Sequence, residues 1–170
     1  MIFCSNFKKM TSREYFVITV KGEIPRFERL IKALPKSKLK YRPHSKSRSA
    51  LELLDLFANE SSHLKIFMQT GLLDFAKAKH KEIKSIGQAL KTLLAGLEQA
   101  VKIAAKLNEA QWNSSAKMVS GTQVEWETTR GNMAWGVLLD LIHHRGQLST
   151  YIRPMGGKVP PIYGPSGDNK

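Results

Sequence analysis

Cysteine is almost absent from this chain. The only cysteine is Cys4, so no disulfide can form within the chain. A chain without disulfides is typical of a reducing compartment, and we expect a cytoplasmic location. If a metal ion is bound, nitrogen and oxygen side chains must supply most of its ligands.

Long apolar runs are missing as well. No stretch stays uncharged for the ~20 residues that a membrane-spanning helix requires. The opening residues lack the apolar core and the small-residue cleavage site of a secretory signal. We therefore expect neither membrane association nor export.

Acidic residues are scarce. The 170 residues include 27 Lys and Arg against 14 Asp and Glu, which gives a formal charge of +13. Such an excess favours acidic partners, and nucleic acid is the first to consider. The basic residues are scattered, however, and no zinc-finger, homeodomain or aromatic RNA-binding signature accompanies them. GxSxG, Walker, HExxH and GxGxxG motifs are also absent. We therefore rank nucleic-acid binding last among the functions considered.

Apolar residues recur at helical spacing in four long segments. Capping boxes begin the first two, Thr11 with Glu14 and Ser49 with Glu52, and Gly71 is placed to end the second. Pro25 is expected to kink the first helix. The predicted helices cover residues 12–33, 49–70, 82–107 and 132–153.

The segments between and after these helices predict irregular structure. Residues 72–79 suit a short extra turn, and residues 108–131 form a long polar connection with at most a brief extended piece. The Gly- and Pro-rich tail after Pro154 is expected to be irregular. The sequence thus predicts one all-α domain over residues 1–170, an antiparallel or crossover four-helix bundle.

Polar residues form one stripe on the last predicted helix. At about 100° per residue, Asp140, His144, Gln147 and Tyr151 share a face of an otherwise apolar helix. On the second helix the same construction puts Glu60 in the middle of the core-facing stripe. A buried carboxylate is costly unless it is paired, protonated or bound to a cation.

These positions predict a metal site inside the bundle. Asp140 and His144, four residues apart, can reach one ion, and Glu60 could complete the set from the facing helix. These ligands suit Zn, Ni, Mn or Fe. His63 and His143 are further candidate ligands on the flanks of their helices.

Structural explanations of the same residues stay open. Asp140 could pair with Arg145 or another basic group, His144 could be a hydrogen-bonded core histidine, and Glu60 could pair with a lysine of a neighbouring helix.

The last helix and tail resemble the DinB-like superfamily of bacterial four-helix-bundle proteins. The resemblance is most specific over residues 140–168, "DLIHHRGQLSTYIRPMGGKVPPIYGPSGD", and continues more loosely over residues 41–61. Members typically bind a divalent metal through one histidine of the second helix and two histidines spaced four apart on the last. Here the pair falls on Asp140 and His144, and the second-helix position falls on Leu56, one turn before Glu60.

The resemblance implies a fold and a function. It implies an up-down-down-up bundle and a homodimer, with which the apolar surface of the last helix around Trp135 is compatible. Relatives include metal-dependent transferases and isomerases that use low-molecular-weight thiols. By resemblance we expect a metal-dependent thiol S-transferase in detoxification or stress response, with Gln147 or Tyr151 orienting the small-molecule substrate. The alternative is a non-catalytic bundle with a degenerate metal site.

Overall fold

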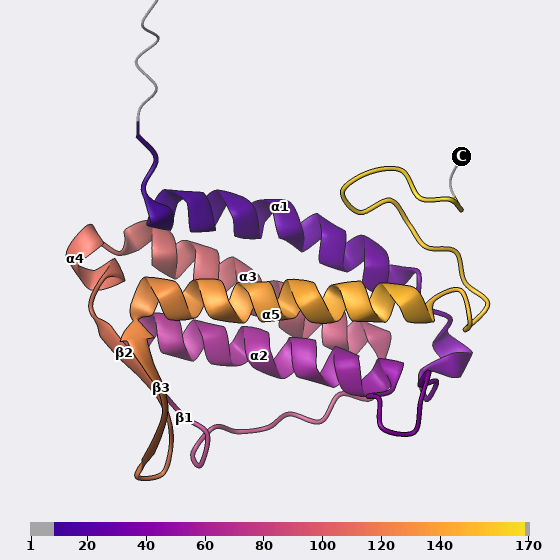
Figure 1. The fold of residues 1–170 in the computed structure, drawn as a ribbon, viewed down its shortest axis with the longest axis horizontal. Helices are drawn as coiled ribbons and strands as arrows, with labels where there is room; N and C mark the ends of the chain where they lie inside the picture. The colour runs from indigo at the N-terminus through magenta and orange to yellow at the C-terminus, as the bar shows by residue number, and fades with distance from the viewer. Residues whose placement is uncertain (1–8, 169–170) are drawn as a thin grey trace, which may run out of the picture.

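Four long helices dominate the computed structural model, which describes residues 9–168 (Figure 1). Cys4 lies outside this range. Each helix has 21 or 22 residues. Their bounds are α1 Ser12–Lys32, α2 Ala50–Thr70, α3 Ile86–Lys106 and α5 Arg130–Tyr151. None of the described helices is long and apolar enough to cross a membrane.

Local sequence signals set most of the helix ends. Both predicted capping boxes are present, at Thr11 with Glu14 and at Ser49 with Glu52. Gly71 adopts the left-handed conformation (φ 75°) that ends α2. α3 begins four residues later than predicted because the Ser85 side chain caps it, accepting a hydrogen bond from the Gln88 amide. α1 continues through Pro25 as one helix.

The helices run in two directions. Arg13 near the start of α1 contacts Glu109 beyond the end of α3, whereas Asp55 of α2 accepts a hydrogen bond from Ile83 just before α3. Helices α2 and α3 therefore run parallel to each other and opposite to α1 and α5, with residues 71–85 crossing over between α2 and α3 (Figure 1). Of the two arrangements left open by the sequence, the crossover one is correct.

The described residues are mostly helical, as predicted, but they are not purely all-α, because a three-stranded sheet is present. The strand order is β1-β2-β3, with β1 parallel to β2 and β2 antiparallel to β3. The predicted turn over residues 72–79 begins as a strand, and the predicted long connection folds into a short helix and a hairpin. The strands are β1 Leu72–Asp74, β2 Ser115–Ser120 and β3 Gln123–Thr129, and the short helices are η1 Lys36–Lys38 and α4 Glu109–Trp112.

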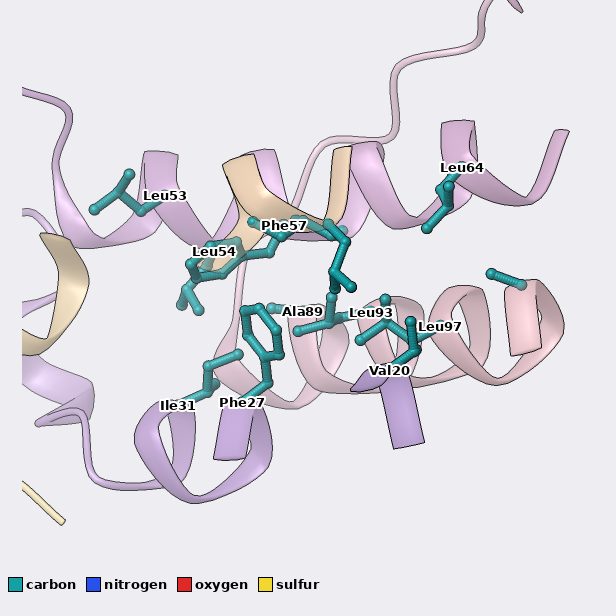
Figure 2. Close-up of a cluster of buried hydrophobic side chains, with 14 of the residues drawn as sticks. Val20, Phe27, Ile31, Leu53, Leu54, Phe57, Leu64, Ala89, Leu93 and Leu97 are labelled. Atoms are coloured by element: carbon teal, nitrogen blue, oxygen red, sulfur yellow. The ribbon is translucent and has the colours of Figure 1, made fainter. Parts of the chain in front are cut away.

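The core lies between the four long helices. Buried Phe27, Phe57 and Leu93 come from α1, α2 and α3 and meet there (Figure 2). The α2 and α3 backbones approach closely at Gly96, where an added Cβ would lie 2.6 Å from Ser61 Oγ. Glycine is therefore the residue that permits this helix contact.

A buried ion pair joins α1 to α5. Glu23 is 3% exposed and Arg145 is 2% exposed, and their side chains contact each other directly. Tyr163 of the tail donates to Glu23 Oε1 (3.0 Å) and accepts from Arg145 Nη2 (2.6 Å). The Arg145 guanidinium also lies 4.7 Å from the centre of the Phe27 ring. This cluster also fixes the irregular tail against the helices.

We expect Gly96→Ala to lower the free energy of unfolding by about 1–3 kcal/mol, because the new methyl group overlaps Ser61 in a packed helix contact. Gly87→Ala on the same helix is the matched control, since nothing lies within 4 Å of its added Cβ. Urea unfolding of the two variants and the wild type measures this, and equal loss of stability in both variants would contradict it.

We expect Arg145→Met to lower the free energy of unfolding by about 1–3 kcal/mol, because the buried Glu23 carboxylate then keeps only Tyr163 and the more exposed Arg26 (2.9 Å) as partners. The control is Arg153→Met, which breaks the more exposed pair with Asp168 (3.0 Å) and should cost less than about 1 kcal/mol. A cost for Arg145→Met as small as the control's would show that the buried pair contributes little.

Candidate metal and substrate site

The predicted polar stripe of α5 forms a chain of contacts. Asp140 Oδ2 lies 3.4 Å from His144 Nε2, and His144 Nδ1 lies 2.9 Å from Gln147 Oε1. Gln147 Nε2 donates to the Tyr151 hydroxyl (3.3 Å), which donates to the Arg48 carbonyl (3.0 Å). The amide and the tyrosine therefore hold the imidazole with Nε2 directed at Asp140.

The Glu60 carboxyl group meets Asp140 across the α2–α5 contact. Glu60 Oε2 is buried and has no hydrogen-bond donor among the described residues. The pKa of the Glu60 carboxyl is raised from 4.5 to about 8, mainly by burial and then by the charge of Asp140 and a hydrogen bond with it, whereas Arg48 opposes the shift. Such a shift favours the protonated form of Glu60 at neutral pH, in which its hydroxyl can donate to the Asp140 carboxylate.

Glu60 and Asp140 lie at one end of a pocket with a volume of about 220 Å³. Its wall comes from α2, α5, the crossover segment and the β2–β3 hairpin. Most of the wall is apolar, and its polar members are Glu60, His63 and Asp140. Of the predicted stripe on α5, Asp140 alone lines this pocket, half-exposed at its rim, whereas His144, Gln147 and Tyr151 lie outside the lining.

The other candidate histidines lie in different surroundings. His63 lines the pocket, and its Nε2 atom is buried without a partner among the described residues. Burial lowers the pKa of His63, and the nearby His80 adds to this effect. His143 is exposed and packs its ring on His144, with ring centres 5.1 Å apart. Leu56 is half-buried and offers no ligand atom.

Comparison with known proteins bears on this site and fold. Residues 13–169 match the DinB family. The chain belongs to the DinB family. A solved DinB-like protein from Bacillus subtilis, YjoA, superposes with a TM-score of 0.68 at 19% identity, over 92% of this chain and 99% of that one. At this identity the likeness concerns the fold alone. No curated protein matches the chain.

The donor atoms of this DinB-family chain lie in pairs, and the two atoms of a pair are placed as two ligands of a divalent cation would be. When a neutral His144 ring donates its Nδ1 proton to Gln147 Oε1, its Nε2 atom carries a lone pair directed at Asp140. Two ligand atoms at about 2.0–2.1 Å from a tetrahedral ion lie about 3.4 Å apart, which matches this separation. Over residues 9–168, however, no three His, Cys, Asp or Glu side chains form a ready metal-binding group. Asp140 instead belongs to two pairs, one with Glu60 and one with His144.

The structure bears on the structural alternatives. Asp140 lies next to the basic group of His144 and not next to Arg145, which pairs with Glu23 on the far side of α5. Within residues 9–168, the cation that acts on Glu60 is Arg48 and not a lysine. The role of Glu23 was missed, although its spacing from Phe16, Val20 and Phe27 puts it on the buried face of α1. His144 is indeed a hydrogen-bonded, largely buried histidine.

We expect the wild-type free energy of unfolding to fall relative to that of Glu60→Gln as pH rises from about 4.5 to about 8. In this window the folded chain keeps a proton on Glu60 that the unfolded chain releases, so rising pH favours unfolding. The glutamine of the variant has no proton to lose.

Urea unfolding at pH 5, 6.5 and 8 measures this difference. Glu98→Gln is the control, since Glu98 is an exposed glutamate of α3, and it should follow the wild-type dependence on pH. If the free energies of unfolding of the wild type and of Glu60→Gln changed with pH in the same way, this would contradict the buried, protonated state of Glu60.

Proposed function

We propose that this DinB-family chain binds a divalent cation, Zn, Ni, Mn or Fe, through Glu60, Asp140 and His144. One observation carries the proposal: Asp140 adjoins both Glu60 and His144 at the end of a largely apolar pocket. Each pair brings acceptor atoms together that a cation would satisfy.

We further propose that the site serves transfer of a low-molecular-weight thiol to a small molecule, in detoxification or stress response. A bound cation would lower the pKa of the thiol and so supply a nucleophile. Gln147 and Tyr151 contribute by holding the His144 ring, since neither lines the pocket.

A specific observation supports the non-catalytic alternative. His144, Gln147, Tyr151 and the Arg48 carbonyl already satisfy one another, and a proton shared by Glu60 and Asp140 needs no metal. In that case the polar residues only position α5 against α2, and the purified protein binds no divalent cation.

We expect the metal-free wild type to bind Mn²⁺, Zn²⁺ or Ni²⁺ in calorimetric titrations, and Asp140→Asn and His144→Gln to bind the same ion more than tenfold less tightly. Even residues that only support metal ligands change affinity by roughly 10–100-fold. His143→Gln is the matched control, because His143 is the exposed neighbour of His144 and should retain wild-type affinity.

Equilibrium dialysis with elemental analysis provides the independent count of bound ions. A wild type that binds none of the three ions would overturn the proposal in favour of the non-catalytic alternative. Equal affinities of wild type and Asp140→Asn would place the ion elsewhere.

A further inference from the structure

The pocket changes character along its length. Helices α2 and α5 run in opposite directions, so Glu60 lies opposite Asp140 while Phe67 lies toward Gly136. At 1.5 Å per residue, Phe67 is about 10 Å along the axis of α2 from Glu60. The acidic residues occupy one end, and the other end lies between Phe67, Leu73 and Gly136. A ligand that fills the pocket therefore needs a polar end and an apolar end.

The outer wall of the apolar end comes from segments outside the four long helices. Trp126 of β3, Met118 of β2 and Phe75 of the crossover segment form it. A Cβ added to Gly136 would lie 2.5 Å from Cη2 of Trp126, so this glycine allows the indole to seat directly on α5. Trp126 is 40% exposed and Phe75 is 46% exposed, which leaves their rings available to a ligand.

The volume of the pocket suits one ring. A cavity of about 150 Å³ with apolar walls is enough for benzene in another protein, and this pocket has about 220 Å³. Aromatic rings prefer offset or edge-on contacts with other rings, which Trp126, Phe75 and Phe67 can provide from different elements. Pockets of this kind use a few polar groups to orient a mainly apolar ligand.

His63 is one of the polar residues of the pocket wall, and its ring packs edge-on against Phe75, with ring centres 6.2 Å apart. Its Nε2 atom has almost no accessible surface and no partner among the described residues, so a ligand reaches it only when the side chains around it shift. A buried ring nitrogen without a hydrogen bond costs free energy until a partner arrives. A hydroxyl or thiol group can both donate and accept, so it satisfies this atom in either tautomer of the ring.

We propose that this pocket binds small aromatic alcohols or thiols, with the ring against Trp126 and Phe75 and the hydroxyl or thiol group at His63 Nε2. This names the substrate class of the site described above. This inference rests on the proposed function only in one respect, namely that the reaction takes place at the polar end of the pocket, beside Glu60 and Asp140. The binding of the ring does not depend on a metal ion.

The test uses benzyl alcohol as the probe, titrated into the metal-free full chain and followed by NMR. We expect saturable binding with shifts of the Trp126 indole signal, at least fivefold tighter than for toluene, which lacks the hydroxyl group. Ethanol, which lacks the ring, should not bind measurably at the same concentrations. If toluene binds as tightly as benzyl alcohol, the role of His63 is wrong.

Two variants locate the ring. Trp126→Ala should weaken benzyl alcohol binding at least fivefold, and Gly136→Ala, which displaces the indole, should do so without removing any aromatic group. Trp135→Ala is the control, because Trp135 of α5 is half-buried outside this pocket and donates to Ser12. Circular dichroism establishes that each variant is folded. Unchanged affinity in both Trp126→Ala and Gly136→Ala would overturn the proposal.

The two proposals fail separately. Trp126→Ala should bind Mn²⁺, Zn²⁺ or Ni²⁺ as the wild type does, because Trp126 provides no ligand atom. Benzyl alcohol binding by a chain that binds no metal would keep the substrate class and remove the metal function. Metal binding by a chain that does not bind benzyl alcohol would keep the metal function and remove the substrate class.

Discussion

The buried pair of Glu23 and Arg145 is the interaction on which the arrangement of α5 depends. A buried guanidinium needs a carboxylate, and Glu23 of α1 is the one it meets. Arg145 lies about 140° around the helix from Asp140, and His144 only about 40°. Fixing Arg145 against α1 therefore turns the polar stripe toward α2. The same contact that stabilises the core sets the direction in which the candidate site faces.

A second consequence concerns the charge balance of the site. Because Arg145 is committed to Glu23, it is not available to Asp140, one turn away on the same helix. Arg48 acts on Glu60 only as an opposing influence, and the raised pKa of Glu60 shows that it is outweighed. Two carboxyl groups at the end of an apolar pocket then need either a shared proton or a cation. The chain has a formal charge of +13, so a site in which the nearby arginine does not offset two carboxyl groups is a specific local property.

The sequence predicts what local rules determine. Capping residues and helical spacing identify α1, α2 and α5 almost to the residue, and helical rotation alone brings Asp140, His144 and Glu60 to facing surfaces. The sheet was missed because its shortest strand, Leu72–Asp74, is a strand only through pairing with residues far along the chain. Glu23 was overlooked because apolar residues alone were used to define the buried face of α1. The place of Phe75 and Trp126 in the pocket wall could not be predicted, because only the folded chain brings their segments to α2 and α5.

The sheet explains how two irregular segments make one wall. The Phe75 amide donates to the Val119 carbonyl (2.8 Å), and Asp74 Oδ1 accepts from the Gly121 amide (3.2 Å) at the hairpin turn. The crossover segment and the hairpin are therefore joined to each other as well as to the helices. The helices hold the polar end of the pocket, where the α1–α5 ion pair sets the geometry, and the sheet holds the apolar end. Residues of the hairpin can consequently change the size and shape of the ligand that fits without disturbing Glu60, Asp140 or His144.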